Sequence, residues 1–94
     1  MSVEYVVVMT TLPADADGPA FGRAVLNERL AACVNILAPM DSVYRWEGRV
    51  EHETERQVII KTTRDRLNAL WDRVRELQVH PQVARRLHGH HGEG

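Results

Sequence analysis

Histidine and cysteine are the residues of this chain best suited to hold a metal ion. Four of the five histidines lie near the end of the sequence, and His88, His90 and His91 stand almost side by side. Neutral imidazole binds Cu(II), Ni(II) and Zn(II) well, so these side chains predict a loose metal chelate. The same stretch is equally compatible with a flexible tail whose metal affinity is incidental.

Cys33 is the only cysteine. Its thiolate would favour Cu(I) or Zn(II), but one thiolate supplies too few ligands for a tight site. The alternative is a small, buried apolar side chain at the start of a strand. A lone cysteine cannot form a disulfide within the chain, which is typical of a cytoplasmic protein.

Composition excludes several functional classes. The chain has 94 residues and a formal net charge of −1, so we expect a single domain and no dedicated nucleic-acid binder. No apolar run approaches the roughly 20 residues that a membrane span needs. The first residues, Met1–Glu4, lack the basic region of a secretory signal, which again favours a cytoplasmic location.

The first elements are a strand and a helix. The apolar run Val3–Met9 is rich in β-branched residues at consecutive positions, which predicts a strand buried on both faces and central in a sheet. Asp15–Pro19 favours a helix start, because aspartate is a good N-cap and proline is tolerated in the first turn. This helix is expected to run to about residues 30 to 32.

The middle of the chain predicts a long hairpin. Strand character over residues 33–38 is interrupted at Pro39, which indicates an edge strand or a bulge, and then resumes. Glu47 and Gly48 suit a tight turn, because glycine accepts a positive φ at the second turn position. Residues 33–62 are therefore expected to form one hairpin, bent midway.

A second helix follows. Thr62–Asp65 resembles an N-cap with a following acid, and apolar residues then recur at helical spacing, namely Leu67, Leu70, Trp71, Val74 and Leu77. The order β-α-β-β-α predicts an α+β protein with a ferredoxin-like split β-α-β fold, in which two helices cover one face of an antiparallel sheet. The final strand of that fold is missing from the sequence. The backbone of Tyr5–Met9 would then lack one neighbour, and we expect hairpins of neighbouring subunits to contribute to the sheet edges.

Motifs in a fixed order along the chain resemble the CutA family of divalent-cation tolerance proteins. They are Glu28–Ile36, Ser42–Gly48, Lys61-Thr62 and Leu77–Pro81. The resemblance covers roughly residues 3–81. It implies a ferredoxin-like fold, a tight homotrimer and a cytoplasmic protein linked to copper and other divalent metals, with no established enzymatic activity and no required cofactor.

The resemblance also implies ligands for copper or another divalent metal. Some CutA proteins are described as binding copper through cysteines and a histidine near the end of the second helix. Cys33 matches one such cysteine, and His80 lies near the histidine position. Thr10 stands where some relatives carry another cysteine.

Tyr44, Trp46, Glu47 and Lys61 form a second candidate site, which we expect to cluster around the hairpin. Tyr44 and Trp46 alternate with Arg45, so both should point to one face of the strand. Aromatic side chains with a polar tip suit a subunit interface or a ligand cleft. In the family these positions lie near the groove between subunits, comparable to the ligand site of the PII signalling proteins. These residues therefore have two interpretations, namely packing at a subunit interface or lining a pocket for a small ligand.

The end of the chain departs from the family. Members continue after His-Pro with a Tyr-Glu-x-Pro-like segment, a last strand and a short tail, whereas Gln82–Leu87 follows here. The sequence thus predicts a CutA-like domain over residues 1–81 and a flexible tail that contains histidine and glycine over residues 82–94.

Catalytic motifs are missing from the sequence. It has no nucleophile elbow and no glycine-rich phosphate loop. We therefore expect a non-enzymatic homotrimer of metal tolerance with weak metal binding. The alternative is a PII-like regulatory domain that binds a small anionic ligand or a nucleotide at a subunit cleft.

Overall fold

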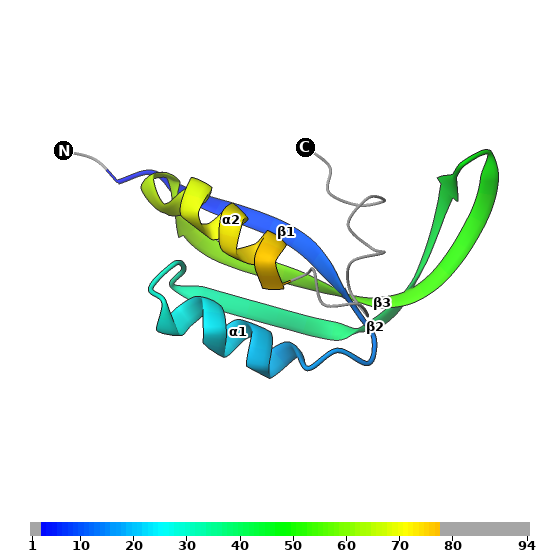
Figure 1. Cartoon of the computed structure of the whole chain (residues 1–94), viewed down its shortest axis with the longest axis horizontal. Coiled ribbons are helices and arrows are strands. Elements are labelled where there is room, and N and C mark those ends of the chain that lie inside the picture. The colour runs from blue at the N-terminus through cyan, green and yellow to red at the C-terminus, as the bar shows by residue number, and fades with distance from the viewer. Residues whose placement is uncertain (1–2, 78–94) are drawn as a thin grey trace.

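The structure is a computed structural model that describes residues 3–77 (Figure 1). The elements are β1 (Tyr5–Pro13), α1 (Gly18–Asn27), β2 (Cys33–Trp46), β3 (Arg49–Thr63), a 3-10 turn (Arg64–Arg66) and α2 (Leu67–Leu77). This order confirms the predicted β-α-β-β-α arrangement. The predictions for His80, for the end of the second helix at Pro81 and for the tail concern residues outside the described range.

The strands form one antiparallel sheet in the order β1-β3-β2. Ile60 of β3 stands opposite Val8 of β1 on one side and opposite Val34 of β2 on the other. Figure 1 shows both helices on the same face of this sheet. The fold is therefore the predicted ferredoxin-like layer of helices on an antiparallel sheet.

The core fills the space between the sheet and the helices. Its fully buried side chains come from every layer: Val25, Val58, Ile60, Leu70 and Val74. The apolar spacing of α2 places Leu70 and Val74 on the covered side of that helix, as the sequence predicts. Neither helix within residues 3–77 is long and apolar enough to cross a membrane.

The environment of β1 differs from the prediction. Among the described residues β1 lies at an edge of the sheet, and Tyr5, Val7 and Met9 are 79%, 61% and 60% exposed. The expectation of a central strand buried on both faces is therefore wrong for this part of the chain. The reason is that the helices cover only one face, so alternate residues of β1 point to an open face.

Helix α1 begins as predicted and ends earlier. Asp17 is the N-cap, and its Oδ1 accepts a hydrogen bond of 2.9 Å from the backbone N–H of Ala20. Pro19 lies in the first turn. The helix ends at Asn27 because Arg29 turns the chain away with a φ of 59°.

The hairpin confirms its predicted turn and irregularity. Glu47 and Gly48 have φ values of 51° and 78°, which is the geometry of a tight hairpin turn. The β2–β3 register shifts between Ile36 and Pro39, so the proline coincides with a bulge in an edge strand.

The hairpin is longer than the rest of the sheet. The last pair that β1 makes is Pro13 with Glu55, whereas β2 and β3 continue to the turn. We call the two-stranded section over residues 41–54 the arm, and Figure 1 shows it projecting from the body. A two-stranded ribbon has little stability of its own, so this arm would gain from a further contact.

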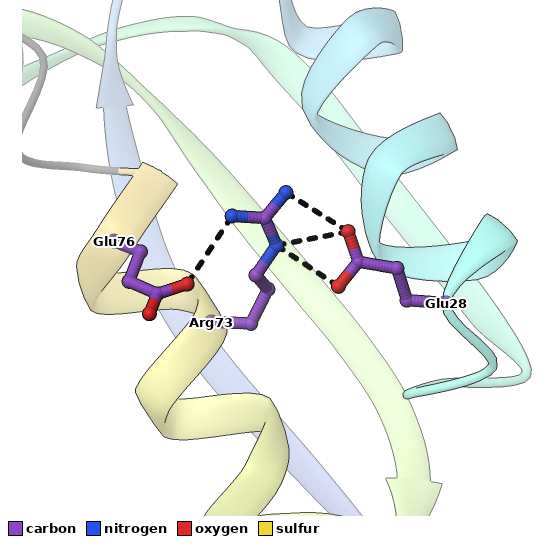
Figure 2. A network of polar contacts seen from close by, with 3 residues as sticks. All are labelled: Glu28, Arg73 and Glu76. Atoms are coloured by element: carbon purple, nitrogen blue, oxygen red, sulfur yellow. Dashed lines mark hydrogen bonds and ion pairs between the residues drawn. The ribbon is translucent and has the colours of Figure 1, made fainter.

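One arginine ties the helices together. The guanidinium of Arg73 on α2 donates from Nε to both carboxylate oxygens of Glu28, each at 2.9 Å, and its Nη1 lies 3.2 Å from Glu76 (Figure 2). The pKa of Arg73 is raised above the ordinary value of an arginine, mainly because of its hydrogen bonds with Glu28. The guanidinium therefore stays charged at all neutral pH values, and α2 is held against the C-cap residue of α1.

We expect Arg73→Ala to lower the midpoint of thermal unfolding by about 3 °C, because it removes the only side-chain ion pair between the helices of residues 3–77. The matched control is Arg75→Ala, since within residues 3–77 Arg75 forms its ion pair with Asp72 of its own helix, at 3.3 Å. Circular dichroism measures both. Equal shifts for the two variants would show that the bridge between the helices contributes nothing beyond an ordinary surface pair.

Candidate functional site

One face of the arm and of its base, where Met40 pairs with Glu55, gathers aromatic and acidic side chains. Alternate residues of β2 share this face and are half-buried, namely Met40, Ser42, Tyr44 and Trp46. Their partners across the ladder on β3 are Glu55, Glu53, Glu51 and Arg49. The prediction that Tyr44 and Trp46 point to one side of the strand agrees with this pattern of burial.

A polar contact joins the aromatic strand to the acidic one. The Tyr44 hydroxyl donates to Glu53 Oε2 at 3.4 Å. Glu55 is only 1% exposed, and together with Tyr44 it lines one end of a hollow of about 690 Å³. Carboxylates at alternate positions of one strand give this face a negative charge, so it is suited to a cationic group.

The three glutamates are the residues that the sequence reasoning missed. The signal was present as Glu51, Glu53 and Glu55, which alternate along a predicted strand. Period-two spacing places such residues on one face, here opposite Tyr44 and its neighbours.

The other members of the predicted hairpin cluster lie apart. Glu47 is exposed in the turn, where its positive φ shapes the hairpin. Lys61 lies at the opposite end of β3, opposite Val7 of β1 and Cys33 of β2. The expectation that Lys61 joins the hairpin cluster is therefore wrong within a single chain, because ten residues of extended strand separate it from Glu51.

Cys33 begins β2 on the open face of the sheet. It is half-buried, and its Sγ lies 3.8 Å from Asn35 Oδ1. Met9, which lies on β1, points to the same open face of the sheet, whereas Thr10 points to the helix side. No group of three or more histidine, cysteine, aspartate or glutamate side chains among residues 3–77 is arranged to hold a metal ion.

The remaining candidate ligands are histidines. His80, His88, His90 and His91 lie outside the described residues. The fifth histidine, His52, sits on the other face of the arm with Nε2 3.0 Å from Asp41 Oδ1. This exposed pair offers too few ligands for a metal site by itself.

Comparison with known proteins gives a consistent result. Residues 6–85 match the family model described as CutA1 divalent ion tolerance protein. The divalent-cation tolerance protein CutA of Thermus thermophilus is 40% identical over 75 residues, which cover 80% of this chain and 71% of that protein. The chloroplastic CutA 1 of Oryza sativa is 40% identical over 74 residues. That match covers 79% of this chain but only 42% of the length of the rice protein.

Solved structures agree with the sequence matches. The crystal structure of CutA1 from Oryza sativa superposes with a TM-score of 0.74 at 40% identity, covering 79% of this chain and 68% of that one. The likeness therefore extends from the sequence to the arrangement of strands and helices described above.

Proposed function

This chain belongs to the CutA1 divalent ion tolerance family, and from that premise we propose that it is a non-enzymatic homotrimer that takes part in tolerance of divalent metal ions, copper among them. The observation that carries the proposal is the family match over residues 6–85. The related proteins are named for tolerance of divalent cations and not for a reaction.

Self-association is supported by apolar surface that a monomer leaves in water. Tyr5, Val7 and Met9 form a row on the open face of the sheet, and Val43 and Val50 of the arm are 67% and 64% exposed. Exposed apolar side chains in rows of this kind are typical of a protein interface. A second copy that covered the open face and the arm would remove it from water.

We expect sedimentation equilibrium at micromolar concentration to give about three times the 10.7 kDa mass of the chain. Apolar burial at the open face favours assembly, so raising the salt concentration should leave the mass unchanged. A stable monomer under these conditions would contradict the trimer.

Metal binding is proposed to be weak and to use few protein ligands. The described residues provide no ready-made cluster of ligands. The candidates are Cys33 and His80, which the family resemblance suggests, and the histidines at positions 88, 90 and 91. A tightly held structural metal is not part of this proposal, because such sites use four protein ligands in closed geometry.

The PII-like alternative is disfavoured by charge. A small anionic ligand at the hairpin would face Glu51, Glu53 and Glu55, which line one side of the arm. Titration calorimetry with Cu(II), Zn(II) and ATP on one sample separates the two functions. We expect heat from the metals and none from ATP; the reverse result would favour the regulatory reading.

A cytoplasmic location is also proposed, since the only cysteine has no partner in the chain with which to form a disulfide. Fractionation of cells that produce the chain tests this.

A further inference from the structure

A small hollow of about 260 Å³, which we call the notch, lies between the end of α1 and the start of α2. Its lining includes two arginines, Arg29 just after α1 and Arg66 just before α2. Figure 1 shows these two helix ends at the same end of the sheet. The described chain leaves α2 at Leu77, about 16 Å along the helix from Arg66, so the notch is built at the other end of α2.

Arg29 has a backbone conformation that arginine disfavours. Its φ is 59°, in the left-handed region that favours glycine. Its N–H donates to the C=O of Leu26 at 2.9 Å, and the N–H of Leu30 donates to the C=O of Val25 at 3.2 Å. This pair of hydrogen bonds forms the helix end that usually carries glycine at the position of Arg29. An arginine held in a strained conformation there indicates a use for its side chain.

Arg66 is bonded to the same loop. Its Nη1 donates a hydrogen bond to the backbone C=O of Arg29. Beside it, the hydroxyl of Thr62 donates to the C=O of Leu30 at 2.7 Å. These bonds tie the loop after α1 to the end of β3 and to the start of α2. The loop that carries Arg29 is therefore held next to Arg66 before any ligand binds, which lowers the entropy cost of binding.

The carboxylates that adjoin the two arginines in the sequence are engaged elsewhere. Glu28 binds Arg73 (Figure 2), and Asp65 accepts a hydrogen bond from a threonine hydroxyl. In the described part of the chain no acidic residue lines the notch, and neither Arg29 nor Arg66 forms a salt bridge. The notch therefore carries two positive charges that no carboxylate of this range neutralises.

We propose that the notch binds a phosphate dianion, either free phosphate or the end of a small phosphomonoester. A guanidinium fork matches phosphate oxygens with two parallel hydrogen bonds, and two such groups balance two negative charges. The hollow is smaller than the roughly 300 Å³ at which pockets for drug-sized ligands begin, so it suits a small ligand. Leu26 and Ala31 offer apolar surface to the carbon chain of an ester. The site is separate from the candidate metal ligands and does not rest on the proposed function.

The affinity is expected to be low. Both arginines are exposed, so water competes with the ligand for their guanidinium groups. We therefore expect a Kd of about 1 mM for free phosphate. Such a site stays empty at the micromolar ligand concentrations at which calorimetry compares metal ions with ATP, and the absence of heat that we expect from ATP is unaffected.

The test is an NMR titration of the full chain with inorganic phosphate, propyl phosphate and dimethyl phosphate, at about pH 8, where the first two are mainly dianions. We expect both dianions to shift the amide signals of residues 29–32 and 62–66. Dimethyl phosphate is a monoanion and should bind about tenfold more weakly. A lower Kd for propyl phosphate than for inorganic phosphate identifies an ester as the source of the phosphate group, and equal values identify free phosphate.

Three variants distinguish the notch from the general charge of the surface. Arg29→Gly should weaken phosphate binding about tenfold and yet raise the midpoint of thermal unfolding by about 3 °C, because glycine takes the positive φ without strain. Arg66→Gln should weaken binding by a similar factor. The matched control is Arg23→Gln, which removes an exposed arginine of α1 outside the notch and should leave the affinity unchanged.

Three results would overturn the proposal. Binding that survives Arg29→Gly, or that falls equally in Arg23→Gln, would mean that the anion is held by surface charge in general. Amide shifts spread over the chain without preference for the notch would mean the same. If the full chain bound neither dianion, the notch would be closed to phosphate.

Discussion

Trp46→Ala is expected to weaken self-association by about 30-fold, or about 2 kcal/mol, while the isolated fold keeps its stability. Trp46 is the last residue of β2 and lies on the arm, beyond the part of the sheet that the helices cover. It takes no part in the hydrophobic core of the described residues. A large aromatic side chain that is half-buried away from its own core is suited to anchor a subunit interface.

The second tryptophan provides the control. Trp71 of α2 packs against the core, so Trp71→Ala should lower the free energy of unfolding directly. Sedimentation equilibrium and urea unfolding, run on both variants, separate the two effects. If Trp46→Ala keeps the same association constant as the unaltered chain, Trp46 is a surface residue and not an anchor.

Local sequence signals predicted most of the fold, because each depends on residues close together in the chain. The Glu47-Gly48 turn sets the hairpin, and the glycine predicts the positive φ of the second turn position, whereas the φ of 51° at Glu47 does not follow from its residue type. Pro39 marks the register shift for an equally local reason, since proline cannot donate to the ladder. The helical spacing of Leu70 and Val74 likewise follows from one helix by itself.

Burial of β1 was not predictable in the same way. The run Val6, Val7, Val8 suggests a strand covered on both faces, yet Val8 is 6% exposed and Val7 is 61% exposed. Which face is covered depends on where the helices pack, and the first strand carries no information about that. An apolar side chain on the open face is also what a surface that binds another copy would show.

The candidate sites require distant residues to meet, which local signals in the sequence do not decide. Tyr44 and Trp46 were correctly assigned to one face, because two neighbouring positions of one strand decide it. The sequence prediction places Lys61 with them around the hairpin, whereas within one chain the length of the hairpin holds it at the far end of β3, opposite Cys33. The length of a hairpin is visible in the sequence, so this separation within one chain could have been calculated from about 3.3 Å per strand residue.

Deletion of residues 87–94 is expected to abolish binding of Cu(II), and this is the largest effect that we predict. The deletion removes His88, His90 and His91, which are close together in the sequence and together can supply three imidazoles to one ion. In contrast, Cys33→Ser should barely change the affinity. Its Sγ donates a hydrogen bond of 3.8 Å to Asn35 Oδ1, and no set of three ligands forms around it among the described residues. Titration calorimetry with Cu(II) on both variants measures the difference.

His52→Ala is the matched control, because it removes one imidazole from the described part of the chain and leaves the carboxyl-terminal histidines intact. His52 pairs with Asp41 at 3.0 Å on the arm, and two exposed groups are too few to compete with a three-imidazole chelate. Its removal should leave Cu(II) binding unchanged. If the deletion preserved binding while Cys33→Ser abolished it, the metal would bind to the open face of the sheet. Cys33 would then be the soft ligand on that face, and the remaining ligands would have to come from another copy of the chain, because Met9 lies two strands away from it across β3.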